Sequence, residues 1–402
     1  MSNHRIQLHK HTLGELLDVT RGMSLPGTNY ATSGELIRLT LGNFDYGGNG
    51  FKENTSKDNI YYSGKVPEEY IMEAGDIITP LTEQTPGLLG TTARIPESGK
   101  YIQSQDVALI TCKPDKLDPL FCYYLVSSSI VKQQLAAGSQ QTKIRHTSPD
   151  KIKACVVYIP EDLTIQHKIG DFLSSIDEKI SLNRKANAEL EALAKQIYDY
   201  WFVQFDFPDE NGRPYKSSGG TMVWNSQLKR EIPACLEPIK AKDICKVLTG
   251  KEDANFSTVG GAYPFFTCSK EVLKCDTPSF NGSAVLIAGN GDFNVKHYSG
   301  EFNAYQRTYV LIPSSNYFAC LYLAANNRIN QFKDKSNGSI VKFITKGDVE
   351  DIELFQSKDS YLYVTLNQII FKIEQGQRET QQLITIRDRL FPLLMNGQVA
   401  IA

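Results

Sequence analysis

The segment from residue 139 to residue 146 is rich in amide and basic side chains. Its candidate binding residues are Ser139, Gln140, Gln141, Lys143 and Arg145, followed by His146. From residue 139 to residue 153 there are four Lys or Arg residues and one Asp. Lysine, arginine and serine side chains bind phosphate oxygens, and glutamine and arginine also hydrogen-bond the edges of nucleic-acid bases. The segment therefore predicts a loop that binds a phosphate-bearing ligand; the alternative is an ordinary solvated loop.

A second polar loop precedes this one. Thr82 and Gln84 lie in the run Thr-Glu-Gln-Thr-Pro-Gly, which ends at Gly87, and Arg94 follows it. Proline and glycine at this spacing favour a turn, which would present its polar side chains to solvent. Thr82, Gln84 and Arg94 are therefore further candidates for the same binding chemistry.

The second half of the chain contains a comparable set of polar and basic side chains. The candidates are Lys251, Asn255, Asn290, Asn294, Lys296, Gln306, Arg307, Ser339 and Lys342. Gln306 and Arg307, directly before an apolar run, are the best single pair, although Arg307 could instead form a structural ion pair. The nearby Phe265 and Phe266 are better explained as core residues than as a stacking surface for bases.

No familiar catalytic motif accompanies these residues. The chain has no GxxxxGK[ST] phosphate loop, no GxSxG elbow and no HExxH pair, and its carboxylates are scattered. It also lacks the Asn/Asp-Pro-Pro-aromatic run with which amino-methyltransferases hold a target amine. We therefore expect that the chain does not catalyse a reaction by itself and holds no metal.

Length and composition exclude several classes of protein. The 402 residues are 41% hydrophobic and 22% charged, enough for two or three domains with buried cores. A formal net charge of −2 argues against binding of nucleic acid through bulk positive charge, but not against a local basic surface. No apolar run reaches the roughly 18–20 residues of a membrane span. The eight cysteines form no CxxC pair, which favours free thiols in a reducing cytoplasm.

The order of predicted elements repeats in the two halves. Residues 13–22 and 241–250 each predict a short helix or turn that ends at a glycine. Short strands follow at 76–79 and 106–110 in the first half, and at 284–288 and 308–312 in the second. Aromatic helical segments at 120–125 and 317–322 come next, and strands at 154–159 and 349–355 close each half. The chain is therefore expected to contain two similar modules of mixed α/β (α+β) fold.

Each half ends in a long helix with a heptad pattern. Apolar seam positions recur in alternating steps of three and four residues, and the two helices match at an offset of 193 residues. The residues predicted to pack in the seam are Ile169, Leu173, Ile176, Ile180, Leu190, Ile197, Leu366, Ile369, Ile373, Leu383 and Leu390. Asn183 and Asn187 interrupt the first seam and Gly376 and Arg387 the second, while Pro392 is expected to end the second helix. Two amphipathic helices on separate cores are the alternative to a coiled coil.

Two divergent modules on an antiparallel pair of helices suit a long, periodic ligand. Duplex DNA is such a ligand, because reading heads one helical turn apart lie about 34 Å apart on one face of it. A rigid spacer would then measure the distance between two half-sites, and the half-sites should differ because the modules differ.

This order of elements resembles the specificity subunits of type I restriction–modification systems over essentially the whole chain. The connector FPDENGRPYKSSGG, followed by Lys-Arg-Glu-Ile-Pro ending at Pro233, is the most specific part of the resemblance. The resemblance implies target recognition domains at 1–160 and 238–358, a central spacer helix at 161–206, a connector at 207–237 and a C-terminal spacer helix at 359–402.

The resemblance also implies the partners. Such a subunit binds an asymmetric, bipartite site in double-stranded DNA and directs adenine methylation and restriction that other chains perform. Two copies of a methyltransferase subunit and the restriction/translocase subunits would be its protein partners. They would carry S-adenosylmethionine, ATP and Mg²⁺, so this chain would bind no cofactor. The alternative is a non-catalytic, two-headed coiled-coil scaffold that binds protein or glycan.

Overall fold

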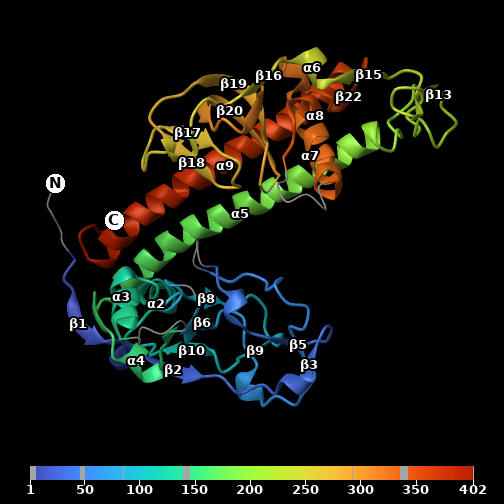
Figure 1. Cartoon of the computed structure of the whole chain (residues 1–402). Coiled ribbons are helices and arrows are strands. Elements are labelled where there is room, and N and C mark those ends of the chain that lie inside the picture. The colour runs from blue at the N-terminus through green and yellow to red at the C-terminus, as the bar shows by residue number, and fades with distance from the viewer. Residues whose placement is uncertain are drawn as a thin grey trace. The chain divides into compact units, whose positions relative to one another are not determined.

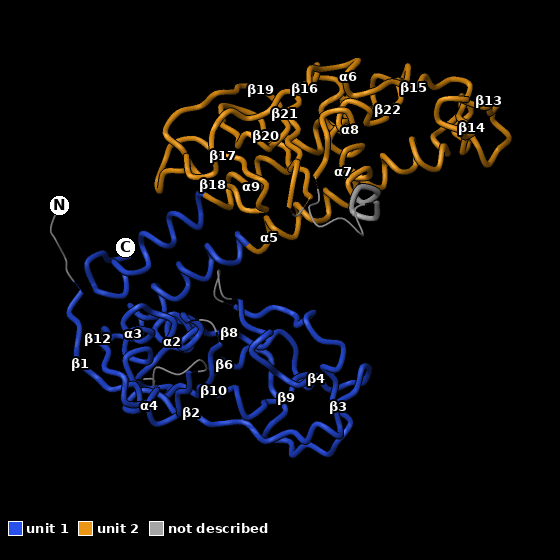
Figure 2. The backbone as a smooth tube through the Cα atoms, in the orientation of Figure 1, with its two compact units in different colours: residues 1–180, 382–402 blue, residues 181–381 orange. Residues whose placement is uncertain are grey.

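The computed structural model describes residues 6–45, 50–84, 86–138, 145–291, 293–335 and 343–401. The chain forms two compact units (Figure 2): residues 1–180 with 382–402, and residues 181–381. The division falls within both long helices, α5 (Leu163–Phe202) and α9 (Ser360–Met395), so that each unit contains a globular module and a part of each helix.

The centre of unit 1 is a four-stranded antiparallel sheet with the strand order β2–β10–β6–β8 (Figure 1). Its strands are β2 (Leu17–Arg21), β10 (Val107–Cys112), β6 (Ile77–Pro80) and β8 (Ala93–Arg94). Successive side chains on a strand point to opposite faces, so Ile77 packs among the helices and Ile78 among the loops of the other face. Both faces of the sheet are therefore buried.

The remaining elements of this module surround the sheet. Four two-residue strands form a second small sheet in the order β3 (Tyr30–Ala31), β5 (Tyr61–Tyr62), β4 (Ile37–Arg38) and β9 (Tyr101–Ile102). Two antiparallel strand pairs are β1 (His9–Thr12) with β12 (Val156–Ile159), and β7 (Thr82–Glu83) with β11 (Arg145–His146). The helices are α1 (Leu13–Leu16), α2 (Pro119–Val126), α3 (Ser129–Ala137) and α4 (Pro149–Lys153).

Unit 2 is built around a six-stranded sheet with the order β16–β21–β19–β20–β17–β18, antiparallel except between β17 and β20. The strands are β16 (Val247–Thr249), β21 (Thr308–Leu311), β19 (Phe280–Ala288), β20 (Val295–Ala304), β17 (Tyr263–Phe266) and β18 (Val272–Cys275). Strands β15 (Glu237–Lys240) and β22 (Glu353–Gln356) pair separately. The helices of this module are α6 (Ala241–Ile244), α7 (Phe318–Lys335) and α8 (Lys346–Glu350).

The two modules confirm the predicted internal repeat and the mixed α/β class. The three-strand order β2–β10–β6 recurs as β16–β21–β19, and the pair β1–β12 recurs as β15–β22. The spacing differs from the prediction, because β12 and β22 begin 197 residues apart, as do α5 and α9. The difference from 193 is about one helical turn of 3.6 residues. A heptad seam still matches itself approximately after such a shift, which explains the error.

The long helices bury the apolar positions that the heptad pattern predicts. Ile169, Leu173, Ile176 and Ile180 are buried in unit 1, and Leu366, Ile369 and Ile373 are buried in unit 2. Leu190, Ile197 and Leu390 are partly buried against the cores of their units, and Leu383 is half-buried.

The polar middle positions of the seam make specific contacts within unit 2. The Asn183 side chain is buried, and its Nδ2 donates to Glu379 Oε2 at 2.8 Å. A Cβ atom on Gly376 would lie 2.5 Å from Asn187 Oδ1, so any larger residue would have to displace that amide. Residue numbers rise along α5 as they fall along α9 at these contacts, so the helices run antiparallel here.

In unit 1, Arg387 is accommodated by an ion pair. Its Nη1 atom donates to Asp177 Oδ1 at 2.8 Å, and the Tyr124 hydroxyl donates to Asp177 Oδ2 at 2.8 Å. Burial, together with the Asp177 charge, raises the pKa of Tyr124. The expected helix end at Pro392 is wrong, because α9 continues to Met395 and buries Leu394 and Met395 in the core. Gly397, at φ 64°, follows the helix instead.

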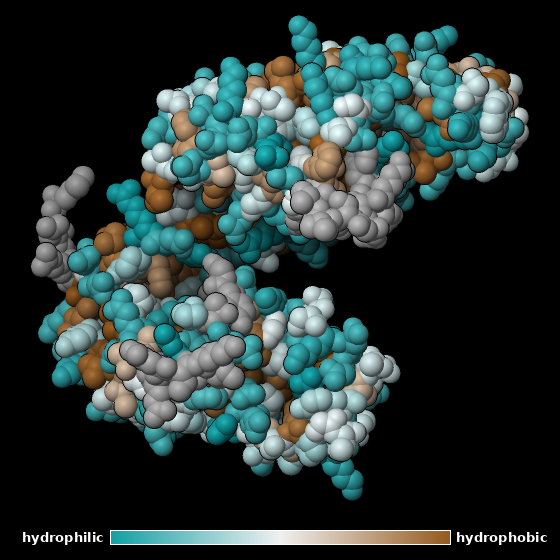
Figure 3. All heavy atoms as spheres, viewed as in Figure 1, coloured by the Kyte–Doolittle hydropathy of each residue, from teal (hydrophilic) through white to brown (hydrophobic). Residues whose placement is uncertain are grey.

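The connector contains the hairpin of β13 (Met222–Asn225) and β14 (Arg230–Pro233). Phe207 stacks between Trp201 and Tyr215, with ring centroids 4.9 and 4.8 Å apart. The visible face of each unit is mostly hydrophilic (Figure 3). Within the described ranges no helix is both long and apolar enough to cross a membrane. All eight cysteines lie in these ranges, and all are free thiols.

Candidate functional site

The two candidate loops of the first module meet at the strand pair β7–β11. Thr82 pairs with His146 and Glu83 with Arg145, although the loops lie about sixty residues apart in sequence. The Glu83 side chain is only 2% exposed, and its Oε1 lies 3.4 Å from Arg145 Nη1. Glu83 Oε2 accepts hydrogen bonds from the backbone N–H groups of residues 87, 88 and 89 at 2.9–3.1 Å. This buried carboxylate therefore fixes the backbone at residues 87–89, shortly after Gln84.

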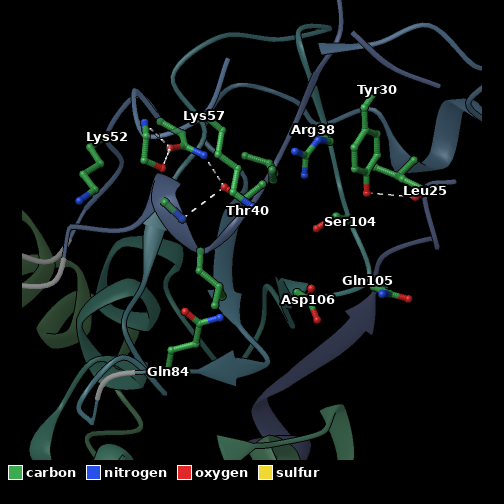
Figure 4. A pocket seen from close by; sticks show the side chains of 15 residues that line it. Leu25, Tyr30, Arg38, Thr40, Lys52, Lys57, Gln84, Ser104, Gln105 and Asp106 are labelled. Atoms are coloured by element: carbon green, nitrogen blue, oxygen red, sulfur yellow. Dashed lines mark hydrogen bonds between the residues drawn. The ribbon is translucent and has the colours of Figure 1, made fainter. Parts of the chain in front are cut away.

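Gln84 lines a polar cleft of about 460 Å³ in the same module. Figure 4 shows Lys52 and Lys57 on the side of the cleft opposite Gln84 and Asp106. Arg38 also lines it, but its guanidinium donates to the Asn59 carbonyl oxygen. Side chains of the types that bind phosphates and base edges therefore converge on one concave surface.

A tight turn at residues 104–107 forms another edge of this cleft. The Val107 N–H donates to the Ser104 carbonyl oxygen at 3.0 Å, and Arg21 Nε donates to the Gln105 carbonyl oxygen at 2.8 Å. Gly22 packs against the turn so closely that a Cβ atom on it would lie 2.3 Å from the Ser104 carbonyl oxygen. Gln105 and Asp106 are thus displayed by a rigid turn, and Gln105 is exposed.

Two predicted residues of the first module lie apart from this surface. Thr82 is buried at 8% exposure because it pairs within β7–β11. Arg94 pairs with Ile77, at the opposite end of β6, and lines a separate cleft with Asp118, Asp171 and other residues. The carboxylates of that cleft would repel a phosphate. The predicted residues Ser139, Gln140, Gln141, Lys143, Ser339 and Lys342 lie outside the described residues.

In the second module, Asn294 and Lys296 bind other parts of the protein. Lys296 Nζ donates to the carbonyl oxygens of Thr267 and Ser269 at 3.1 and 2.5 Å, and to Asn294 Oδ1 at 2.7 Å. Asn294 Nδ2 donates to the Cys268 carbonyl oxygen at 2.8 Å. Burial lowers the pKa of the Lys296 ammonium group to about 8. Both side chains therefore hold the loop at 267–269 in place rather than point into solvent.

The other predicted residues of this module lie on neighbouring loops at one end of the six-stranded sheet. Lys251, Asn255, Gln306 and Arg307 are exposed, and half-buried Asn290 forms an antiparallel bridge with Phe343. That bridge corresponds to the β7–β11 pair of the first module. Gln306 Nε2 donates to Asp253 Oδ1 at 2.8 Å, which links the loop after β16 to the turn before β21.

The turn at residues 305–308 matches the turn at 104–107. The Thr308 N–H donates to the Tyr305 carbonyl oxygen at 2.8 Å, and the Gly250 N–H donates to the Thr308 carbonyl oxygen at 3.0 Å. A Cβ atom on Gly250 would lie 2.0 Å from the Ala304 carbonyl oxygen. The Arg307 side chain makes no ion pair with any described residue, so the structural alternative for it finds no support there.

Because Gly250 has no space for a side chain, Gly250→Ala is expected to destabilise unit 2. The added methyl group must displace the backbone at residues 304–305, and such overpacking costs about 1–3 kcal/mol. A lower midpoint of thermal unfolding for the purified protein would measure the loss. Gly347→Ala in α8 is the matched control, because the nearest atom to a new Cβ lies 3.8 Å away. Equal midpoints for the two variants would contradict the prediction.

Sequence reasoning missed Lys52, Lys57, Gln105 and Asp106. Gln105 could have been found, since it precedes β10 as Gln306 precedes β21 in the repeat. The two lysines give no signal in the sequence, because only the tertiary fold brings them to the cleft. Within the described residues, no group of three or more His, Cys, Asp or Glu side chains is placed to hold a metal ion.

Comparison with known proteins identifies relatives over most of the chain. The family model "Type I restriction modification DNA specificity domain" matches residues 9–192 and 235–355. The specificity subunit of the type I restriction enzyme EcoDI from Escherichia coli is 34% identical over 176 residues, which cover 42% of this chain and 40% of that protein. The MjaIX specificity subunit from Methanocaldococcus jannaschii is 22% identical over 311 residues, 70% of this chain and 69% of that one.

A solved structure has the same fold. The S subunit of a type I restriction–modification system from M. genitalium aligns with 100% of this chain and 98% of its own, with a TM-score of 0.66 and 17% identity.

Proposed function

The chain belongs to the type I restriction–modification DNA specificity family, and we propose that it is the DNA-recognition subunit of such a system. It would bind a split, asymmetric site in double-stranded DNA, one half through each module. The proposal includes a cytoplasmic location, where the DNA lies.

The observation that carries the proposal is the repeated end of the two modules. In the first module the chain that follows β6 pairs with the chain that follows α3, at β7–β11. In the second module the chain that follows β19 pairs with the chain that follows α7, at the bridge between residues 290 and 343. In each module a glycine directly after β2 or β16 packs against the turn before β10 or β21. The scaffold is therefore common, whereas the displayed side chains differ. Two DNA-binding modules that share a fold but differ in their exposed side chains fit a bipartite asymmetric site.

The chemistry is assigned to other chains. Two methyltransferase subunits would methylate adenine with S-adenosylmethionine, and restriction/translocase subunits would use ATP and Mg²⁺. The present chain would hold the DNA and the methyltransferase subunits and would itself be non-catalytic and free of cofactor. The absence of catalytic motifs in the sequence supports this division.

Sequencing of methylated bases in host DNA tests the proposal. Deletion of the chain is expected to abolish adenine methylation at one split motif, and replacement of residues 1–160 by those of a relative is expected to change one half of that motif. Replacement of residues 238–358 should change the other half, and is the matched experiment. A methylation pattern that is unchanged by deletion would contradict the function. A change of both halves by a single exchange would contradict the modular assignment.

A further inference from the structure

The strongest unassigned feature is the pair of equivalent turns at residues 104–107 and 305–308. We propose that the third residue of each turn, Asp106 in the first module and Arg307 in the second, determines one base of its half-site. This inference rests on the proposed function, and goes beyond it by naming the discriminating residues.

The two turns are the same structural device. Each lies directly before the central strand of the shared order and is closed by a hydrogen bond from its last N–H to its first carbonyl. Each is contacted by the chain leaving the first strand through a glycine, Gly22 or Gly250, that leaves no space for a Cβ atom. A parallel bridge follows in both cases, from Met23 to Ser104 and from Glu252 to Tyr305. Position 106 in one module therefore corresponds to position 307 in the other.

The equivalent positions carry opposite charges. The turns have Gln at the second position, Gln105 and Gln306, and differ at the third, where Asp106 stands against Arg307. Neither the Asp106 carboxylate nor the Arg307 guanidinium has a hydrogen bond or ion pair with a described residue. Charged groups that have no partner among the described residues remain available for a ligand.

The surroundings fit a contact with DNA. Asp106 lines the same cleft as Lys52 and Lys57, whose ammonium groups suit the phosphates that flank a base contact. A carboxylate accepts a hydrogen bond from the N4 amino group of cytosine, whereas arginine donates two to O6 and N7 of guanine. We therefore expect that Asp106 contacts a cytosine in one half of the recognition sequence, and that Arg307 contacts a guanine in the other half.

The test uses the complete complex, formed by this chain and its methyltransferase subunits. In Arg307→Gln, the position read by Arg307 should lose its preference for guanine by roughly 5- to 100-fold, because a good base contact contributes that much discrimination. The rest of the motif should be unchanged. Asp106→Asn should relax one position in the other half-site. Methylation of host DNA, sequenced at single-base resolution, gives the motif for each variant.

Matched controls remove the same charges elsewhere in the same modules. Lys246 directly precedes β16, and Asp18 lies on β2; both side chains are exposed. Each lies near the end of its strand that is farther from the turn. Lys246→Gln and Asp18→Asn should leave the motif intact. An Arg307→Gln motif identical to that of the wild type would overturn the inference.

Binding measurements decide the case in which Arg307→Gln abolishes methylation altogether. The purified complex would be titrated with duplexes that carry each base pair at the guanine position. Similar affinities for all four would support base reading. Alternatively, the variant could bind all four duplexes more weakly, keep the guanine preference and show a salt dependence lower by about one phosphate contact. That result would assign Arg307 to the DNA backbone and overturn the inference. If the wild-type complex itself shows no split motif that depends on the chain, the proposed function fails as well.

Discussion

Glu83→Ala is expected to disorder the backbone at residues 87–89, and on the proposed function it should also weaken the binding of DNA by the first module. The substitution removes the acceptor of three backbone N–H groups and the partner of Arg145. Each buried donor left without a partner costs about 1–3 kcal/mol. The loop can avoid that cost only by moving its N–H groups into water, which displaces Gln84 from the cleft.

Hydrogen exchange gives a direct measurement of this effect. The amides of Leu88 and Leu89 should lose protection in Glu83→Ala, whereas those of β10 should keep it, because the core of the sheet is not altered. Glu97→Ala is the control, since Glu97 forms an exposed ion pair with Lys100, and such surface pairs contribute little to stability. Undiminished protection at Leu88 and Leu89 would show that Glu83 does not hold the loop.

The architecture could be predicted because apolar periodicity is a local property of the sequence. Strands such as β6 and β19 and the two long helices each have a pattern that their own residues determine. The offset between the halves could not be obtained from the helices alone, because a heptad seam fits its counterpart nearly as well one turn away. The strands β12 and β22, which begin 197 residues apart and pair with β1 and β15, fix the offset. The helix end predicted at Pro392 was wrong, because burial of Leu394 and Met395 compensates for the backbone hydrogen bond that proline cannot donate.

The candidate surface was less predictable, because the same residue types bind ligands and also stabilise the interior of loops. Lys296 was selected for its charge, yet three oxygen atoms of the protein surround its ammonium group. Arg307 was selected by the same reasoning and is exposed. Lys57 and Asp106 were not selected, because their approach to one cleft depends on contacts between segments distant in sequence. The internal repeat is the signal that would have improved the selection, since it relates the turn before β10 to the turn before β21.

Glu374→Leu is expected to destabilise unit 2 by about 1–3 kcal/mol, because it leaves the buried Nδ1 atom of His297 without its hydrogen-bond partner. Glu374 on α9 and His297 on β20 have side chains 6% and 5% exposed, and Glu374 Oε1 lies 2.9 Å from His297 Nδ1. The guanidinium of Arg378 lies 3.9 Å from the other carboxylate oxygen and also donates to the Ser299 carbonyl oxygen. The pair thus joins the second module to the long helix. The midpoint of thermal unfolding of the purified protein measures the loss, and Glu350→Ala, which removes a surface ion pair, should change it little.

A double variant distinguishes the desolvation of a lone histidine from the loss of a favourable interaction. Replacement of both partners of a buried hydrogen bond by apolar groups of similar shape can be nearly neutral, since neither polar group is then left unsatisfied. His297→Phe combined with Glu374→Leu removes both polar groups and keeps an aromatic ring beside Tyr322, whose centroid lies 4.6 Å from that of His297. We expect this variant to recover most of the stability lost in Glu374→Leu. A double variant no more stable than the single one would show that the hydrogen bond itself holds β20 on α9. On the proposed function, the double variant should also recognise the same DNA sequence as the wild type, because the apolar replacement preserves that packing.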